Sequence, residues 1–196
     1  MWLPRLFAGV DVRALGSGNI GATNVWRTLG FKLGLSVALL NIAKGAAAVL
    51  LARWLGDDLV AVLAGCAATV GHWRPLFVRF ARGGKIVATT GGVGLALAPL
   101  ATLSAAGVWI AVFLVTRYAS VASMLAAVTL PLLALLFDAS WPVVAFTGAA
   151  AIAIVVLHRT NIARLARGQE HKMSLRRRHA PPGLGTSGAP LQSKRV

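Results

Sequence analysis

The chain has 196 residues, 57% of them hydrophobic and 13% charged, and its mean hydropathy of +0.74 excludes an ordinary soluble domain of this length. Its net charge of +15 could suit nucleic acid, but the basic residues stand in gaps between apolar runs, so we expect no nucleic-acid partner. Cys66 is the single cysteine and lies in an apolar run, which excludes an intrachain disulfide.

Apolar runs bounded by polar gaps predict an all-α, polytopic membrane bundle of six helices, over residues 33–52, 59–71, 86–98, 100–116, 121–137 and 142–157. The run 86–98 would be only about 20 Å long, which a Gly-rich helix tolerates where it lines a cavity. We expect residues 1–172 to form the membrane domain. Residues 173–196, rich in Arg, Pro and Gly, are expected to be a disordered basic tail.

The gaps between these runs differ in charge. Residues 11–32, 73–85 and 158–178 and the residue Arg117 make basic gaps, which alternate with acidic gaps at Asp57, Asp58 and Asp138. Because basic loops stay on the cytoplasmic side, the pattern places all basic gaps and the C-terminus in the cytoplasm. The tail would then contact anionic lipid, or have no function beyond being solvated.

The first polar segment, residues 14–27, combines glycines with hydroxyl and amide side chains. Glycine lets backbone amides turn toward an anion, and side chains add donors, so candidate ligands here are Gly16, Ser17, Gly18, Asn19, Thr23 and Asn24. The spacing Gly16-x-Gly18-x-x-Gly21 also matches a dinucleotide fingerprint, but no strand precedes it, so we reject that reading. A helix-capping loop without a ligand is the alternative.

The second polar segment, residues 71–92, contains His72 and the run Arg82-Gly83-Gly84-Lys85 ahead of a short helix. Cations, unhindered backbone and a helix N-terminus together favour a phosphate. Arg74 and Arg79 are expected to anchor the membrane interface.

The third polar segment, residues 158–172, follows the last apolar run. On a continuous helix His158, Asn161 and Leu165 would share one face, and Arg164, Arg167 and His171 would share another, giving a substrate face and a lipid face. An interfacial histidine without a catalytic role is the alternative for His158.

Lys44 interrupts the first long apolar run. A charge within a membrane helix is costly and by default marks a functional site, with snorkelling to the interface as the alternative.

Together these segments resemble the bacterial acyl-phosphate:glycerol-3-phosphate acyltransferase family, the PlsY type, over residues 9–172. The matching motifs are Gly16-Ser-Gly-Asn-Ile-Gly-Ala-Thr-Asn24 with Arg27, Gly71-His72-x-x-Pro75, Gly83-Gly84-Lys85, Arg117-Tyr-x-Ser120, and His158-x-x-Asn161-x-x-Arg164-Leu-x-x-Gly168-x-Glu170. The resemblance implies a seven-helix bundle in the bacterial inner membrane, with its motifs at the cytoplasmic face.

The activity that the resemblance implies is transfer of a fatty acyl group from acyl phosphate to glycerol 3-phosphate, giving lysophosphatidic acid and phosphate without a metal or cofactor. Arg27, Lys85 and Ser120 would bind phosphate, and Ser17, His158 and Asn161 would contact the reacting acyl phosphate. Further substrate-binding candidates are Gly16, Gly18, Asn19, Asn24, Lys44, His72, Gly83, Gly84, Arg164 and Glu170. Membrane lipids and the enzyme that forms acyl phosphate are the expected partners.

The sequence departs from the family pattern at several points. The family begins with a complete membrane helix, whereas only residues 2–10 precede Asp11 here, so six membrane helices are expected. Asn41 stands where Asp is common, an extra residue lies near Ala81, Arg82 replaces Lys, and Ile86 replaces a glycine.

Two other functions fit parts of the pattern. A transporter for an anionic metabolite would also have broken, Gly-rich helices and inward-facing cations, but the two halves of the chain show no internal repeat. An inactive scaffold derived from the acyltransferase is the other alternative.

Overall fold

The structure is a computed structural model that describes residues 2–75 and 83–173, so the predicted sites at Arg79 and Arg82, the extra residue near Ala81 and the tail from residue 174 lie outside it. The described residues form helices and no strand. The helices are α1 (Trp2–Ala8), α2 (Ala22–Leu29), α3 (Phe31–Arg53), α4 (Asp58–Trp73), α5 (Val87–Leu97), α6 (Pro99–Thr116), α7 (Ala119–Leu136), α8 (Trp141–Leu157) and α9 (Arg159–Ala166), with a short 3-10 helix η1 (Val12–Ala14).

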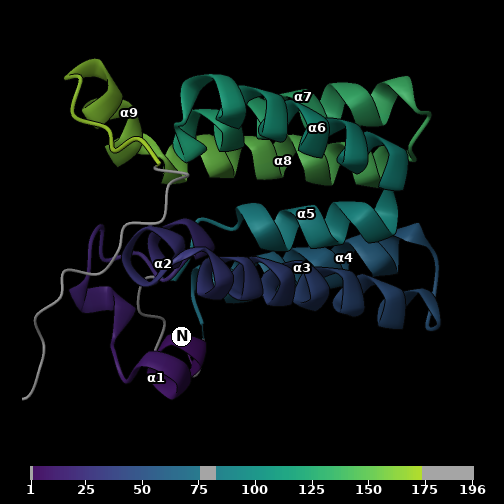
Figure 1. The fold of residues 1–196 in the computed structure, drawn as a ribbon. Helices are drawn as coiled ribbons and strands as arrows, with labels where there is room; N and C mark the ends of the chain where they lie inside the picture. Colours follow the sequence, from purple (N-terminus) through teal and green to yellow (C-terminus); the bar gives the residue numbers. More distant parts are fainter. Residues whose placement is uncertain (1, 76–82, 174–196) are drawn as a thin grey trace, which may run out of the picture.

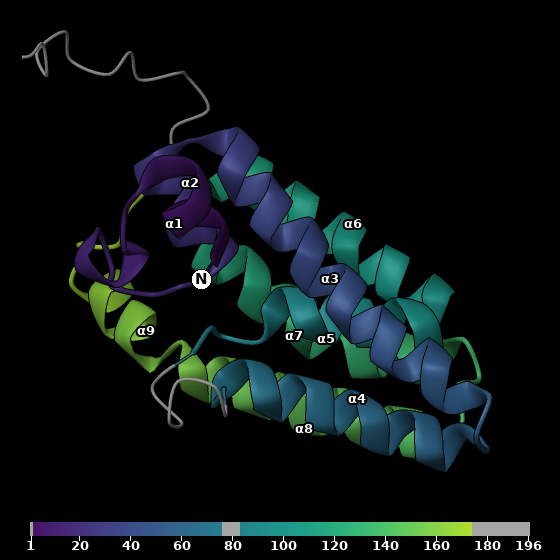
Figure 2. The ribbon, with the colours of Figure 1, turned by 90° about the horizontal axis from the view of Figure 1, so that it is seen from below.

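The long helices form two layers (Figure 1). Helices α3, α4 and α5 make one layer, and α6, α7 and α8 make the other, with successive helices reversing direction. Each of the six predicted apolar runs corresponds to one of these helices, so the all-α bundle is confirmed. Seen from below in Figure 2, α4 lies over α8, and these two helices join the layers along one side.

Local signals explain where the helices begin and end. The carboxylate of Asp57 accepts hydrogen bonds from the amides of Leu59 and Val60, which caps α4. Pro99 opens α6 at a position where no amide donor is needed. Arg117 ends α6 in a left-handed conformation, with φ of 65°, before α7 starts at Ala119.

Two glycines allow α3 and α5 to pack backbone against backbone. A Cβ atom at Gly92 would clash with the carbonyl oxygen of Ile42, and one at Gly45 would clash with the carbonyl oxygen of Thr89. These close contacts hold the short helix α5 inside the bundle, where it is shielded from lipid.

Helices α3, α6 and α7 are long and apolar enough to cross a membrane, and the pair α8 and α9, bent by 53°, could act as a fourth span. Helices α4 and α5 are apolar but shorter than that limit. The expected number of six crossings therefore stays a prediction, although the helices themselves are present.

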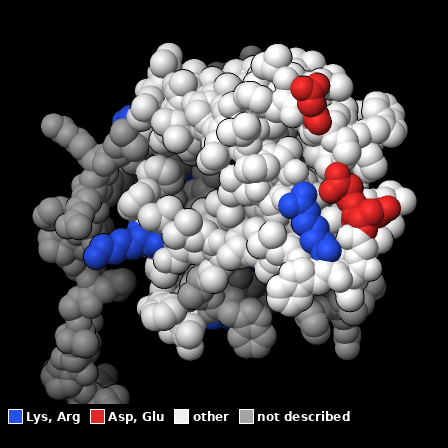
Figure 3. Space-filling model, turned by 90° about the vertical axis from the view of Figure 1, so that its right-hand side faces the viewer, with Lys and Arg blue, Asp and Glu red and all other residues white. Residues whose placement is uncertain are grey.

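The two ends of the bundle differ. Helices α1, α2 and α9 gather at one end (Figure 1), together with the basic gaps of the sequence. The opposite end, shown in Figure 3, is mostly uncharged and carries acidic side chains with a basic side chain beside them; Arg53 lies 3.7 Å from Asp58. There Ser140 donates a hydrogen bond of 2.7 Å to Asp58.

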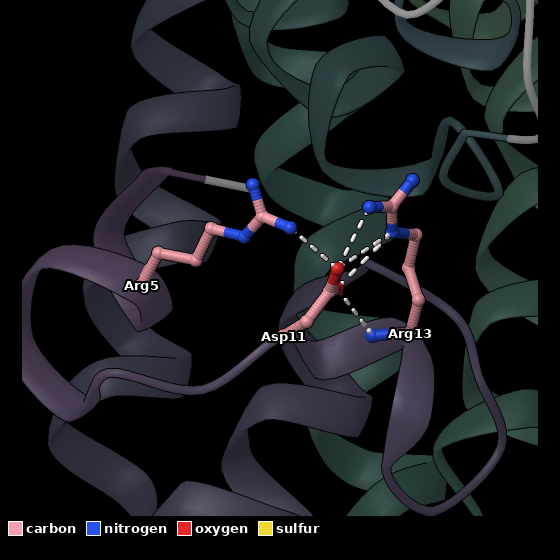
Figure 4. A network of polar contacts seen from close by, with 3 residues as sticks. All are labelled: Arg5, Asp11 and Arg13. Carbon is pink, nitrogen blue, oxygen red and sulfur yellow. Dashed lines mark hydrogen bonds and ion pairs between the residues drawn. The ribbon is translucent and has the colours of Figure 1, made fainter.

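The N-terminal segment is tied together by Asp11, whose carboxylate lies between two guanidinium groups (Figure 4). Arg5 and Arg13 approach it to 2.8 and 2.7 Å. Hydrogen bonds from Arg13 and then from Arg5 hold the pKa of the Asp11 carboxyl well below its ordinary value. The exposed residues of α1 are therefore anchored to the start of η1.

Candidate active site

A cavity of about 560 Å³ lies between the two helix layers and contains most of the predicted site residues. Its end near α9 is polar, and its walls toward the middle of the bundle are apolar. Of the predicted site residues, the following line it: Ser17, Asn19, Asn24, Arg27, His72, Lys85, Ser120, His158, Asn161, Arg164 and Glu170. These side chains come from α2, α4, α7 and α9 and from the segments that flank them, and they meet in one space.

The predicted helix faces of residues 158–172 are wrong for Arg164. Helix α9 ends at Ala166, and Gly168 adopts a left-handed conformation with φ of +66°, so the chain turns back toward the cavity. This turn brings Glu170 against α9, where its carboxylate accepts a hydrogen bond of 2.8 Å from Nε of Arg164. Arg164 and Asn161 are three residues apart on α9, and both line the cavity.

Glu170 is the centre of this polar network. Its Oε1 accepts hydrogen bonds from Asn161 at 2.6 Å and from Ser120 at 2.9 Å, and the residue is only 8% exposed. Burial alone would raise the pKa of the carboxyl, but the hydrogen bonds from Asn161, Arg164 and Ser120 outweigh it and lower the pKa. The carboxylate is thus held ionised and fixes three residues from α7 and α9.

Lys85 completes the network from the segment before α5. Its ammonium group donates a hydrogen bond to Oδ1 of Asn161. The next residue, Ile86, is 4% exposed and has φ of 59°, a left-handed conformation that glycine adopts more easily. Its side chain packs against Ala127, Ala151 and Ile154, and this contact fixes the backbone directly behind Lys85.

Asn24 organises the Gly-rich loop before α2. Its Oδ1 accepts from the amide of Ser17 at 3.0 Å, and its Nδ2 donates to the carbonyls of Leu15 and Asn19 at 3.0 and 2.8 Å. The backbone amide of Gly18 donates a hydrogen bond to the carbonyl oxygen of Leu15. The prediction that this loop turns its amides toward an anion is therefore wrong for Ser17 and Gly18, because the loop uses these amides for its own structure.

The glycines of this loop allow its tight path. Gly16 and Gly18 have φ of +56° and +69°, and a Cβ atom at Gly16 would lie 2.6 Å from Oδ1 of Asn24. Ser17, Asn19 and Asn24 line the cavity, and substrate contact by these residues and by Gly16 and Gly18 stays a prediction.

Arg27 and His158 approach the polar end from opposite sides. Arg27 is half-buried, and its Nε has no hydrogen-bond partner among the described residues. Burial lowers the pKa of its guanidinium, and the charge of Glu170 opposes this shift. Nδ1 of His158 donates to the carbonyl oxygen of Ile154 at 2.8 Å, so in the neutral ring Nε2 is the hydrogen-bond acceptor.

Lys44 does not line the cavity in the described part of the chain; its Nζ lies 3.0 Å from Nδ1 of His72, which does. Gly83 and Gly84 pass directly against His72. Asn41, which stands where the family commonly has an aspartate, also lines the cavity. Its Nδ2 donates to the carbonyl oxygen of Val37 within α3.

The apolar half of the cavity was not predicted from the sequence. Its walls include Ala105, Trp109, Ala126 and Leu130, which are ordinary residues for a membrane helix. The indole of Trp109 donates to Ser123 at 3.0 Å, which joins α6 to α7. A pattern of small residues on α6 and α7 was the only available signal.

The sequence model of the glycerol-3-phosphate acyltransferase family matches residues 1–168. The chain belongs to this family. A glycerol-3-phosphate acyltransferase of Desulforudis audaxviator is 47% identical over 175 residues, which cover 89% of this chain and 88% of that protein. A second relative, glycerol-3-phosphate acyltransferase 2 of Moorella thermoacetica, is 45% identical over 172 residues and 88% of each chain.

Solved structures support the same assignment. The crystal structure of PlsY, an integral membrane glycerol 3-phosphate acyltransferase, in its glycerol 3-phosphate form superimposes with a TM-score of 0.82 and 37% identity over 88% of each chain. The lysophosphatidic acid form matches with a TM-score of 0.76 and 38% identity, over 81% of this chain and 82% of that chain. The chain is therefore an integral membrane protein, as its composition predicts.

Proposed function

We propose that this chain transfers a fatty acyl group from acyl phosphate to the 1-hydroxyl of glycerol 3-phosphate, forming lysophosphatidic acid and inorganic phosphate for phospholipid synthesis. The observation that supports this most directly is the division of one cavity into two halves. Arg27, Lys85 and Arg164 lie at one end, and that end continues into an apolar space. Cations suit the phosphates of both substrates, and the apolar walls suit an acyl chain.

The reaction needs positioning more than activation, because acyl phosphate is already an activated donor. The hydroxyl oxygen of glycerol 3-phosphate bonds to the acyl carbon, and the bond from that carbon to the phosphate oxygen breaks. Nε2 of His158 accepts the hydroxyl proton, since Nδ1 is occupied by Ile154. Lys85 and Arg27 stabilise the negative charge that develops on the leaving phosphate.

Ser17 and Asn161 hold the reacting groups in this arrangement. Ser17 projects into the cavity from a loop that Asn24 fixes, so its hydroxyl can donate to the acyl phosphate. Asn161 joins Lys85 to Glu170 and sets the position of the ammonium group. Contacts that position a substrate-binding group matter because a small displacement of that group lowers the rate of acyl transfer strongly.

The acyl chain has a lateral route into the cavity. Leu35 on α3 and Ile110 on α6 line the cavity and are 42% and 53% exposed, as expected where a cavity opens between two helices. In a bilayer the outside of these helices faces lipid. The acyl chain therefore enters sideways, while its phosphate stays at the polar end.

The orientation follows from the charges. The position of α9, α2 and the basic gaps at one end, together with the positive-inside rule, supports a bacterial inner-membrane protein whose cavity has its polar end on the cytoplasmic side. Glycerol 3-phosphate then enters from the cytoplasm, and the enzyme that forms acyl phosphate acts on the same side. No metal or other cofactor takes part in this proposal.

The closed inner end of the cavity disfavours the transporter alternative. On α6, Thr102 packs against Gly94 of α5, since a Cβ atom at Gly94 would lie 2.5 Å from its hydroxyl oxygen. Leu130 from α7 also lines this end of the cavity, is 5% exposed and belongs to the hydrophobic core. A transported metabolite would have to pass this packed region.

Purified protein in lipid nanodiscs, supplied with palmitoyl phosphate and glycerol 3-phosphate, tests the proposal. We expect equal amounts of lysophosphatidic acid and phosphate, and Lys85→Ala should lower the rate at least about thirtyfold while the protein still inserts into the membrane. Lys32→Ala, at the exposed start of α3, is the matched control and should keep the rate. If the folded wild-type protein forms no lysophosphatidic acid, the proposal is wrong and the chain is an inactive scaffold derived from the acyltransferase.

A further inference from the structure

Lys44, a charged residue in the middle of α3, contacts His72, and the ring of His72 lies against the segment that carries Lys85. Its Nζ lies 3.0 Å from Nδ1 of His72, in the last turn of α4. Lysine can only donate, so Nδ1 accepts, and the neutral ring carries its hydrogen on Nε2. This contact fixes both the position and the tautomer of the histidine.

The other side of the His72 ring lies against the segment that carries Lys85. A Cβ atom at Gly84 would clash with Nε2 of His72, so the ring occupies the space where any other residue would place its side chain. A Cβ atom at Gly83 would clash with the carbonyl oxygen of His72. The amide of Gly83 also donates to the carbonyl oxygen of Trp73 at 2.8 Å.

We propose that Lys44 and His72 form a clamp that positions Lys85 by holding Gly84 against the imidazole ring, and that Lys44 does not itself bind substrate. The inference rests on the proposed function, in which Lys85 binds phosphate. From Gly84 the chain continues to Lys85 and then to Ile86, whose side chain is anchored between α7 and α8. The clamp fixes the segment on one side of Lys85 and Ile86 fixes it on the other.

The clamp explains a membrane charge that contacts no described cavity residue except this histidine. A lysine within an apolar helix is costly unless it is paired, and positions of this kind persist where they have a function. Here the function is to orient the imidazole ring of His72 through its Nδ1.

A pair of double-mutant cycles tests the contact between His72 and Gly84. We expect Gly84→Ala to raise the KM for glycerol 3-phosphate about tenfold or more with a smaller change in kcat, because the added methyl group displaces Lys85. In a His72→Ala background the same change should have almost no further effect, since the ring is gone. Gly83→Ala is the matched control: its clash is with a backbone oxygen, so its effect should persist in the His72→Ala background.

A second cycle tests Lys44. Lys44→Met should raise the KM about fivefold in the wild type and leave it unchanged in the His72→Ala background. An equal loss in both backgrounds would show that Lys44 acts directly on substrate and would overturn the clamp. This cycle also decides the question if Gly84→Ala does not fold.

Each cycle is measured in two ways: by the rate of acyl transfer, and by the affinity for glycerol 3-phosphate determined by calorimetry in detergent. Binding that shows the coupling without any acyl transfer would overturn the proposed reaction and support the clamp. Acyl transfer with independent effects of Gly84→Ala and His72→Ala would overturn the clamp alone. A wild-type protein that binds neither glycerol 3-phosphate nor inorganic phosphate would overturn both.

Discussion

Asn161 donates its side-chain amide to Glu170 across 2.6 Å, and this contact decides which end of the amide faces Lys85. Because Nδ2 is used by the carboxylate, Oδ1 is the atom that accepts the ammonium hydrogen of Lys85. One acidic residue that follows α9 thus sets the position of a cation from the segment before α5. Ser120 and Arg164 bind the same carboxylate, so Glu170 aligns groups from several helices.

Replacing this carboxylate should disturb the site without removing the cavity. Glu170→Gln keeps the shape but loses the charge that Arg164 and Asn161 contact, so we expect kcat/KM to fall about tenfold to a hundredfold, as for loss of hydrogen bonds to a charged group. The measurement is phosphate release in nanodiscs. Gln169→Ala, at the exposed neighbouring position, should keep the wild-type rate, and an equal loss in both variants would contradict the role of Glu170.

The stability that Glu170 contributes should depend on pH in one direction. Its pKa in the folded protein lies below the ordinary glutamate value, so the unfolded chain takes up a proton first as the pH falls. The contribution is therefore complete above the ordinary pKa and is lost as the pH drops through the lower folded value. Thermal unfolding of wild type and Glu170→Gln in detergent should show a constant difference near neutral pH that shrinks in acid; a difference that widens in acid would contradict this.

The apolar half of the cavity should determine which acyl chains react. Ala126 and Leu130 lie on the same face of α7, and both line the cavity. Leu130 is about 15 Å along the helix from Ser120. Ala126 lies between these two residues and therefore lines the inner part of the cavity. Ala126→Leu should shift the product mixture at least about tenfold toward decanoyl over palmitoyl chains, at about fourfold per excluded methylene. Mass spectrometry of the lysolipid from equal amounts of both donors measures this.

The control for chain selection is Ala111→Leu, which makes the same change on the exposed side of α6 outside the cavity. It should leave the product mixture unchanged. If Ala126→Leu lowers both rates equally, the wall at α7 has no part in chain selection.

Ile86 offers a test of backbone strain next to Lys85. Its φ of 59° costs a β-branched residue about 1–2 kcal/mol, while its buried side chain packs against Ala127 and Ile154. Both Ile86→Ala and Ile86→Gly should destabilise the protein by removing that packing. The glycine variant should nevertheless be more stable than the alanine variant by about 1 kcal/mol, the reverse of their order in a helix, as measured by unfolding in detergent.

Close contact between α3 and α5 should make Gly92 intolerant of any side chain. Gly92→Ala would drive a methyl group into the carbonyl oxygen of Ile42, and we expect the protein to lose several kcal/mol of stability or fail to fold. Gly107→Ala on α6 is the matched control, because nothing lies within 4 Å of a Cβ atom there. Melting temperatures in detergent should separate the two, and equal tolerance would show that α3 and α5 can move apart.

The polar end of the site could be predicted from sequence because its motifs place many charged and amide side chains in short segments of an apolar chain. Lys85, Asn161, His158 and Arg27 were recognised in this way, and the structure brings them into one cavity. The network around Glu170 could not be predicted. It depends on where α9 stops and on a turn at Gly168, which brings Glu170 back against Arg164 and Asn161.

The roles of individual residues depended on contacts between distant segments. The sequence predicts Asn24 as a substrate ligand, but its side chain forms hydrogen bonds with the backbone of the loop of residues 12–19. Lys44 reads as a site residue, but its partner is His72, 28 positions later. A motif records which residue types are present and says nothing about which of their hydrogen-bonding atoms are already used.

The sequence by itself determined the membrane class, the six apolar helices and the segregation of basic gaps, because the water-to-lipid transfer of a side chain depends on its own chemistry and spacing along the chain. The tertiary structure alone decided the shape of the cavity, its apolar wall and the hydrogen-bond partners of each polar group. These depend on distances between helices, which small residues such as Gly45 and Gly92 set, and no local property of the chain encodes them.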